Sequence, residues 1–334
     1  MAHIEPPRRI GIVATSLLVL FASACDEAST RGRALADLQA PSGVATTDHA
    51  LGLGWTATST DADIPQDPPA EGARAATMRI VAANLTSGNR QSWDPGHGAR
   101  ILKALAPDIV LIQEFRIGNN SEADIRAFVD EAFGPTFDFA RENNVLPNGI
   151  ISRWPLRQAG VWRDAEVADR NFSWAEIDLP GSTDLWAISV HLLSSSSTKR
   201  QRQALALMRL IEEHIPSDAL IVVGGDFNTR TSGERALDVF ASRFELARHA
   251  RDRRGNPNTN AGRNRPYDWV MPNYGLDALQ IDVVFESQSY PDGLVFDTRL
   301  YSSATASIEP ALPRDSAAQG MQHMAVVRDF RRPN

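Results

Sequence analysis

Two apolar runs of strand length are followed closely by side chains that bind hard cations. Asn84 follows the run 79–83, and Glu114 stands two residues after the run 109–112. Hydrolysis of a phosphate ester needs a divalent cation, an activated water and donors that neutralise charge developing on phosphorus. Because carboxylate and carboxamide oxygens suit Mg²⁺, the pattern predicts a metal site with Asn84 and Glu114. Taken singly, a turn-forming Asn and a solvent-exposed Glu explain the two residues equally well.

A more specific pattern lies in residues 220–228, where four apolar residues are followed by Gly-Gly-Asp-Phe-Asn. In an extended chain Asp226 and Asn228 project to the same side, because side chains alternate with a period of two. Asp226 can then orient or deprotonate the attacking water, and the Asn228 amide can donate to a developing oxyanion. A strand followed by an Asx turn is the plainer interpretation, and it explains the glycines but not the whole pattern.

Six segments, taken in chain order, resemble the motifs of the endonuclease/exonuclease/phosphatase superfamily. The resemblance covers residues 79–330, about three quarters of the chain, and six ordered motifs are more specific than any one of them. The segments are Gln113-Glu114, Gly149-Ile150-Ile151-Ser152-Arg153-Trp154-Pro155, Ser189-Val190-His191-Leu192, Gly225-Asp226-Phe227-Asn228, Tyr267-Asp268-Trp269 and Gln322-His323-Met324.

This resemblance implies a fold and an activity. The expected fold is a four-layer α/β sandwich, in which two mainly antiparallel or mixed β-sheets lie face to face between helices. The expected activity is hydrolysis of phosphate esters with Mg²⁺, or alternatively Mn²⁺ or Ca²⁺, at one end of the sandwich. The implied roles are Asn84 and Glu114 at the metal, His191 as a donor to the phosphate, Asp226 and Asn228 as above, and His323 as the catalytic histidine oriented by Asp268.

The pairing of Asp268 with His323 also makes physical sense by itself. A carboxylate bonded to one ring nitrogen fixes the tautomer and leaves the other nitrogen free to act on water or phosphate. A lone histidine is more often structural than catalytic. Two of the seven histidines, His191 and His323, nevertheless fall at motif positions.

One position departs from the family pattern. The family usually has Asp directly before its terminal histidine, whereas this chain has Gln322. A neutral carboxamide still offers an oxygen, so Gln322 is predicted as a third metal ligand, but it binds a hard cation less strongly than a carboxylate does. We therefore expect weak metal affinity.

A loop rich in arginine and asparagine precedes Asp268. Residues 248–265 contain six arginines and four asparagines, and such a loop can hold a polyphosphate backbone. We predict Arg251, Arg253 and Arg254 as substrate-binding residues. The alternative is an ordinary solvated loop, because runs of surface charge are commonly just that.

The elements that must position these residues are strands alternating with a few helices. Many strands with few helices favour two packed sheets over a doubly wound single sheet. The expected strands are 79–83, 109–113, 149–152, 172–179, 185–191, 220–224, 267–271, 281–285 and 325–330. The expected helices are 97–105, 122–133 and 199–215, with the serines of 194–197 capping the last.

The N-terminal segment is predicted to direct export. Two arginines precede an apolar run that is too short to span a membrane, and Cys25 follows small residues, which resembles a lipoprotein signal. We predict a signal peptide at 1–25, a disordered linker at 26–75 and a catalytic domain at 76–334. Cys25 would then anchor the protein in the bacterial cell envelope; plain secretion is the alternative.

Composition narrows the class of protein. The chain has 334 residues, 43% of them hydrophobic, and a net charge of −7, as expected for a globular protein. Residues 1–75 hold nine acidic and five basic residues, so the remainder, with 32 acidic and 29 basic, carries −3. A nearly neutral domain does not attract nucleic acid by its overall field, so a local basic patch must do so. We expect a monomer.

Three functions remain open at this point. The first is a nuclease-type phosphodiesterase acting on DNA or RNA. The second is a phosphatase or phospholipase C-like enzyme that acts on a lipid headgroup or a sugar phosphate, which membrane anchoring would favour. The third is a non-catalytic binding module on the same fold, for which Gln322 is the strongest support.

Overall fold

The apolar runs of the sequence form two β-sheets. The structure is a computed structural model and describes residues 76–85, 96–301 and 308–333. The first sheet has seven strands in the order β10-β14-β1-β2-β4-β3, with β13 also paired to β14. Its strands are β1 (Thr77–Ala83), β2 (Ile109–Ile112), β3 (Asp138–Arg141), β4 (Gly149–Ser152), β10 (Gln280–Ile281), β13 (Leu294–Phe296) and β14 (Ala325–Arg331).

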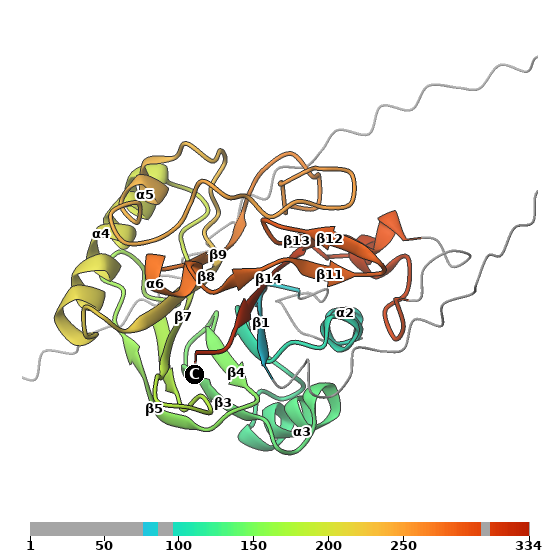
Figure 1. The fold of residues 1–334 in the computed structure, drawn as a ribbon, viewed down its shortest axis with the longest axis horizontal. Helices are drawn as coiled ribbons and strands as arrows, with labels where there is room; N and C mark the ends of the chain where they lie inside the picture. The colour runs from blue at the N-terminus through green and yellow to red at the C-terminus, as the bar shows by residue number, and fades with distance from the viewer. Residues whose placement is uncertain (1–75, 86–95, 302–307, 334) are drawn as a thin grey trace, which may run out of the picture. The chain divides into compact units, whose positions relative to one another are not determined.

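The second sheet has five strands in chain order, β5 to β9. A separate hairpin of two strands, β11 and β12, lies beside β13 and β14 (Figure 1). The strands are β5 (Leu156–Trp162), β6 (Phe172–Ile177), β7 (Leu185–His191), β8 (Leu220–Asp226), β9 (Asp268–Pro272), β11 (Val283–Phe285) and β12 (Gln288–Tyr290).

Helices cover the outer faces of the two sheets. In Figure 1, α4 and α5 lie on one side of the domain, and α2 and α3 lie on the other. The helices are α2 (His97–Leu105), α3 (Glu122–Phe133), α4 (Ser197–His214), α5 (Arg235–Asp238) and α6 (Tyr274–Asp277), with the short 3₁₀ turns η1 (Thr298–Leu300) and η2 (Asp315–Ala317).

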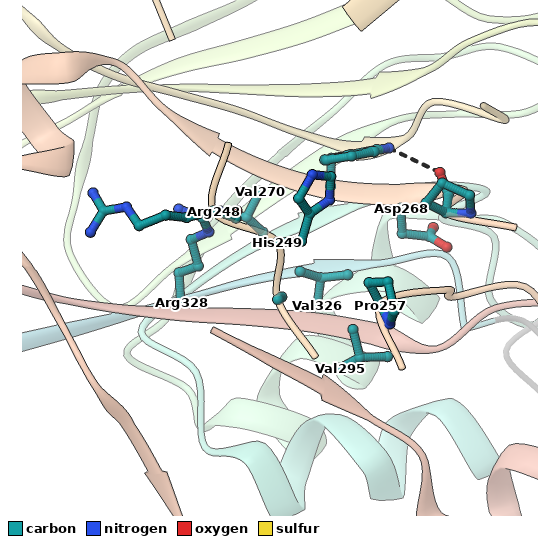
Figure 2. A pocket seen from close by; sticks show the side chains of 11 residues that line it. Arg248, His249, Pro257, Asp268, Val270, Val295, Val326 and Arg328 are labelled. Atoms are coloured by element: carbon teal, nitrogen blue, oxygen red, sulfur yellow. Dashed lines mark hydrogen bonds between the residues drawn. The ribbon is translucent and has the colours of Figure 1, made fainter. Parts of the chain in front are cut away.

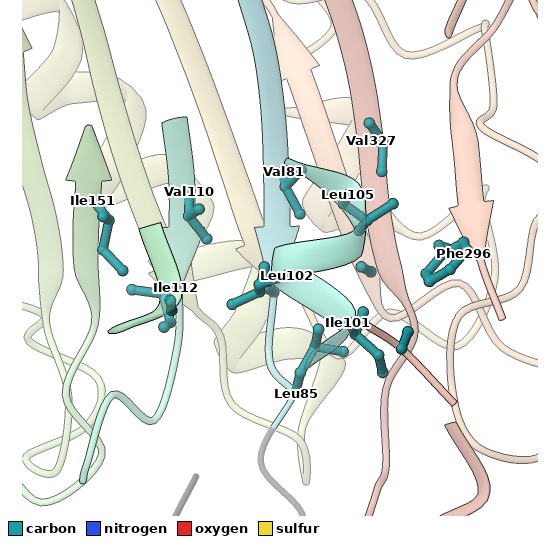
Figure 3. Packing of buried hydrophobic residues seen from close by; sticks show 14 of the residues in the cluster. Val81, Leu85, Ile101, Leu102, Leu105, Val110, Ile112, Ile151, Phe296 and Val327 are labelled. Atoms are coloured by element: carbon teal, nitrogen blue, oxygen red, sulfur yellow. The ribbon is translucent and has the colours of Figure 1, made fainter. Parts of the chain in front are cut away.

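Three apolar cores separate four layers. In β1, Ile80 faces the core between the two sheets, and its neighbour Val81 faces the core under α2 and α3. Figure 3 shows Leu102 and Leu105 of α2 packed over Val81 in that outer core. A third core lies between the second sheet and α4. Strands buried on both faces read as continuous apolar runs, and the expected four-layer sandwich is confirmed.

Serine side chains begin the two longest helices. The Ser121 hydroxyl accepts from the Asp124 amide and forms a capping box with it at the start of α3. Ser196 accepts from the Lys199 amide at 3.3 Å, so the predicted serine cap of α4 is present.

The pairing of the strands brings the site residues to one edge. β1 runs parallel to β2, and β7 runs parallel to β8, so the carboxyl ends of each pair lie together. β14 is antiparallel to β1 and β9 is antiparallel to β8, so the beginnings of β14 and β9 lie at that same edge. Every predicted catalytic side chain is placed at one of these strand ends.

The predicted signal peptide, linker and Cys25 lie outside the described residues and stay predictions. Within the part of the chain that the structure describes, no helix is long and apolar enough to cross a membrane.

Candidate active site

Three buried strands of the second sheet align three of the predicted catalytic residues. His191 ends β7 opposite Asp226 at the end of β8, and Asp226 lies opposite Asp268 at the start of β9. From the first sheet, Asn84 follows β1, and His323 lies two residues before the start of β14. All five side chains are at least nine-tenths buried.

His323 and Asp268 form the pair expected from the sequence. His323 Nδ1 lies 3.1 and 3.0 Å from the two carboxylate oxygens of Asp268. The Asp268 amide donates to Thr259 Oγ1 at 2.8 Å, and Thr259 also accepts from the Met324 amide beside His323. Thr259 therefore holds both partners from the loop that precedes β9.

Asp226 lies at the centre of the cluster. Its Oδ2 is 3.2 Å from His191 Nε2, 3.5 Å from His323 Nε2 and 3.1 Å from Asn84 Nδ2. The Asn84 amide also donates to Glu114 Oε1 at 3.2 Å. These contacts place one carboxylate between two histidines, with the second carboxylate joined to it through Asn84.

The glycine before Asp226 is required by the close packing of the two sheets. Gly225 has φ +131°, and a Cβ built on it would lie 2.2 Å from the Val190 carbonyl oxygen and 2.5 Å from Gln113 Nε2. Only glycine meets both conditions. The break in the apolar run therefore has a definite cause, because Gly225 lets Asp226 approach the first sheet.

Asn228 combines the two interpretations that its pattern allowed. Its amide donates to Asp226 Oδ1 at 2.8 Å, which is the Asx turn, and its φ of +51° suits an asparagine. Its side-chain Nδ2 donates to the Leu192 carbonyl at 3.0 Å. That nitrogen carries a second hydrogen, which can donate to an oxyanion.

Two acids of the cluster, Glu114 and Asp226, are held away from water. Burial raises the pKa of the Glu114 carboxyl from 4.5 to about 7. Burial, together with the charge of Asp268, raises the pKa of Asp226 from 3.8 to about 6. Buried carboxylates that lack a full counter-charge are the ordinary environment of a bound cation.

The pKa values of the two histidines, His323 and His191, shift in opposite directions. Burial lowers the pKa of His323, but the carboxylates of Asp268 and Asp226 outweigh it and raise that pKa from 6.5 to about 10. Burial, with the charges of Arg170 and His323, lowers the pKa of His191 well below 6.5. At neutral pH His323 is a cation in the metal-free protein, and His191 is neutral.

The cluster contains groups that fit a divalent cation. Asp226, Asp268 and His323 can bring ligand atoms within 4.8 Å of one another, although His323 Nδ1 already occupies the Asp268 carboxylate. Asn84 Oδ1 and Glu114 Oε2 are also buried and have no hydrogen-bond partner. Because two unpaired hard oxygens at one place are costly unless something binds them, we favour Asn84 and Glu114 as ligands.

Comparison with known proteins agrees with this geometry. A sequence model of the endonuclease/exonuclease/phosphatase family matches residues 97–303. The chain belongs to this family. Members of the family hydrolyse phosphate esters. The match ends before His323 and begins after Asn84, and the fold brings these two residues within 3.4 Å of each other. A comparison with curated proteins gave no match.

Solved structures show the family fold at low identity. An endonuclease/exonuclease/phosphatase from Beutenbergia cavernae DSM 12333 is 17% identical, with a TM-score of 0.52, over 77% of this chain and 72% of that one. The Bacteroides vulgatus protein of the same description is 16% identical, with a TM-score of 0.52, over 77% and 99%. A protein from Enterococcus faecalis V583 is 14% identical, with a TM-score of 0.51, over 76% and 100%.

The side chain of Gln322 does not lie where the predicted role as a metal ligand requires. His323 forms a β-bridge with Asn260, and the Gln322 carbonyl accepts from the Ala261 amide at 2.7 Å. In an extended segment neighbouring side chains point to opposite sides, so an inward His323 turns Gln322 outward. The side chain of Gln322 is exposed, and the structure does not bring it into the buried cluster.

The three predicted substrate-binding arginines are exposed but differ in position. Arg251 and Arg253 line a surface cleft beside β12, whereas none of the catalytic residues does so. The Arg254 amide donates to Asp252 Oδ1 at 2.8 Å, and Arg254 does not line this cleft.

Two residues near the site were not predicted as site residues. Arg170 is buried, pairs with Asp169 at 2.8 Å, and lowers the pKa values of both Glu114 and His191. Nothing in its local pattern distinguishes it from a surface arginine. The Tyr267 ring, 5.6 Å from that of His323, was read only as part of a motif.

A narrow cavity lies behind the catalytic pair. Its volume is about 20 Å³, which holds one water molecule. Figure 2 shows Asp268 and Arg328 at opposite ends of the lining, with His249 between them. His323 does not line this cavity, and its volume leaves no space for a substrate.

Proposed function

We propose that this chain is a divalent-metal-dependent phosphoesterase of the nuclease type, which cleaves a phosphodiester by attack of water. The observation that carries the proposal is the buried His323–Asp268 pair packed against Asp226, with distances of 3.0 and 3.5 Å. Such a group places an acid, a base and an orienting carboxylate within reach of one phosphate.

The metal site is proposed from atoms that otherwise have no partner. Asn84 Oδ1 and Glu114 Oε2 would hold Mg²⁺, the ion that two hard oxygens and substrate phosphate suit best. When bound, the cation supplies Lewis-acid stabilisation of the phosphate oxygens. Gln322, with its side chain at the surface, is left out of this ligand set.

The residues of the chain then divide the proton transfers. Asp226 accepts a proton from the attacking water as its oxygen bonds to phosphorus. The His323 imidazolium, oriented by Asp268, gives its Nε2 proton to the leaving oxygen as the ester bond breaks. The free hydrogen of the Asn228 amide donates to a remaining phosphate oxygen. The neutral His191 ring, whose Nε2 lies 3.2 Å from Asp226 Oδ2, orients that carboxylate through its single N–H. Transfer of one proton from Asp226 to His323 restores the starting state.

A nuclease-type substrate is favoured by one arginine near the site and by three exposed arginines on a loop outside it. Arg170 adds a buried positive charge beside Glu114 and His191, and Arg251, Arg253 and Arg254 are exposed on one loop. Guanidinium groups bind phosphate in a bidentate manner, which suits a chain of phosphodiesters. Export and lipidation of Cys25 stay proposals from the sequence, and they would place the activity at the cell envelope.

One substrate panel tests this proposal. The purified protein is assayed on plasmid DNA, RNA, sphingomyelin and inositol phosphates, with and without Mg²⁺. We expect Mg²⁺-dependent cleavage of nucleic acid. Hydrolysis of sphingomyelin or inositol phosphates alone would overturn the nuclease assignment, and no hydrolysis of any substrate would favour the binding-module function.

A further inference from the structure

A cleft of about 400 Å³ lies outside the catalytic cluster. One wall is the loop 251–255, and the other is the segment 288–293, which contains β12 and leads into β13. Arg251 and Arg253 are both exposed in this cleft.

The two guanidinium groups are oriented but keep their charge available. Arg251 Nη1 donates to the Gly255 carbonyl at 3.0 Å, and Arg253 Nη1 donates to the Leu300 carbonyl at 3.2 Å. The Arg253 guanidinium also stacks over the Tyr301 ring at 5.0 Å. Among the described residues, neither arginine has a carboxylate within salt-bridge distance.

The nearest acid in the loop is already neutralised. Asp252 pairs with Arg263 at 2.6 Å, and Arg263 also pairs with Asp297 at 2.9 Å. Asp292, which is partly buried, also lines the cleft and is the remaining acid there. Two arginines against one carboxylate leave the cleft with a net positive charge.

The same loop reaches the catalytic pair. Arg263 pairs with Asp252, which lies between the two arginines of the cleft. Thr259, further along the same segment, accepts from the Asp268 amide at 2.8 Å. Because internal ion pairs and hydrogen bonds already order the loop, a ligand would lose little entropy by binding to it.

Strand register gives the separation of the cleft from the site. Arg251 lies opposite Leu294, and Leu294 lies opposite Val327 of β14. His323 precedes Val327 by four residues, or about 13 Å along the strand, and the two lateral steps add about 10 Å. The two Cα atoms, of Arg251 and His323, are therefore about 16 Å apart.

We propose that this cleft is a second phosphate-binding site, which holds the backbone of a single nucleic-acid strand while another phosphate of that strand occupies the catalytic cluster. The inference rests on the proposed nuclease function. Arg253 covers the Tyr301 ring, and Tyr290, the aromatic residue in the lining, is buried, so the cleft offers mainly guanidinium groups to phosphate. The site therefore binds without regard to sequence.

The geometry predicts a dependence on substrate length. The two sites lie about 16 Å apart and each takes a separate phosphate, so a substrate must carry more than one phosphodiester to occupy both. A dinucleotide cannot reach both sites, whereas a strand of fifteen nucleotides can. The cleft should therefore affect the longer substrate alone.

The test uses the full chain with the double substitution Arg251→Gln and Arg253→Gln. We expect the KM for a single-stranded 15-nucleotide substrate to rise about tenfold, with kcat unchanged and with no change for a dinucleotide. Loss of two phosphate contacts on a single strand should lower the slope of log KM against log salt by about 1.4. The double substitution to Lys should recover part of the loss.

The matched control is Arg331→Gln, which removes an exposed arginine at the far end of β14. An equal rise in KM for this control would show a general charge effect and would overturn the proposal. So would an unchanged KM for the 15-nucleotide strand in the double variant, or an equal loss on the dinucleotide.

A binding measurement separates this proposal from the catalytic one. A fluorescent 15-nucleotide strand is titrated with the His323→Ala protein in EDTA, with and without the two Gln substitutions. We expect the Kd to rise about tenfold when the arginines are removed. If the wild type hydrolyses phosphodiesters but the strand binds equally well without the arginines, the cleft proposal fails and the proposed function stands.

Discussion

Replacement of the buried acid Glu114 by Gln should stabilise the metal-free protein while it impairs metal-dependent activity. Burial raises the pKa of Glu114 from 4.5 to about 7, so its charged form is less favourable in the folded state than in the unfolded state. At about 1.36 kcal/mol per pKa unit, this difference corresponds to about 3 kcal/mol. Gln keeps the acceptor for the Asn84 amide and removes the charge.

The direction in which stability changes with pH follows from proton binding to Glu114 in the folded and unfolded states. Between pH 4.5 and about 7 the unfolded chain has released the Glu114 proton and the folded protein has kept it, so wild-type stability falls as pH rises. Above pH 7 the loss is complete. Glu114→Gln should therefore exceed the wild type by about 3 kcal/mol at pH 8 but by only about 1 kcal/mol at pH 5.

Urea unfolding in EDTA at pH 5 and pH 8 measures both differences. Saturating Mg²⁺ should restore wild-type stability at pH 8 and should leave the Gln variant much less affected, because the variant lacks one ligand charge. A variant that is less stable than the wild type at pH 8, or equally favoured at both pH values, would refute the reasoning.

Three further substitutions have definite expected outcomes. Gly225→Ala should lower the unfolding free energy by more than about 2 kcal/mol, because the position combines a positive φ with a backbone clash. Gly233→Ala should not lower it, because Gly233 has open space around it. Chemical denaturation of both variants measures the two effects. Asp268→Asn should lower kcat on the order of 10²–10⁴-fold with little change in KM, because His323 loses its orienting charge; near-wild-type steady-state kinetics would contradict this. Gln322→Asp should shift the activating Mg²⁺ concentration less than about twofold, because the side chain points outward. A tenfold decrease of that concentration in a Mg²⁺ titration would show that residue 322 reaches the metal.

The sequence predicted elements best where burial was strongest. The helices 97–105 and 122–133 and the strands 149–152 and 185–191 have the expected bounds, because their apolar patterns are clear. β8 continues to Asp226, two residues beyond the expected end, because a strand can contain the two glycines where the sheets approach closely.

Elements that are short or partly exposed were not predicted. β5 is an edge strand with four exposed residues out of seven, and β3 begins with an exposed Asp138. β12 and β13 have three residues each, which is too short for a periodic signal. These strands form through pairing with neighbours that a single sequence does not reveal.

Among the site residues, too, those with a local sequence signal were predicted and those that depend on the fold were missed. Residues that end apolar runs, such as Asn84, His191 and Asp226, were predicted because a polar residue after a buried strand is conspicuous. Arg170 was missed because its burial depends on the fold, and the outward direction of Gln322 depends on the β-bridge between His323 and Asn260. Neither property is present in local sequence.

The most direct test of the account is the hydrolysis of a simple chromogenic phosphodiester by the wild type and by His323→Ala. Our account predicts wild-type turnover in Mg²⁺, loss of turnover in excess EDTA and recovery when Mg²⁺ is restored. His323→Ala should keep the wild-type circular dichroism spectrum and lose on the order of 10²–10⁴-fold in kcat. Full wild-type activity in EDTA, or undiminished activity of the folded His323→Ala variant, would contradict metal-dependent hydrolysis at this cluster.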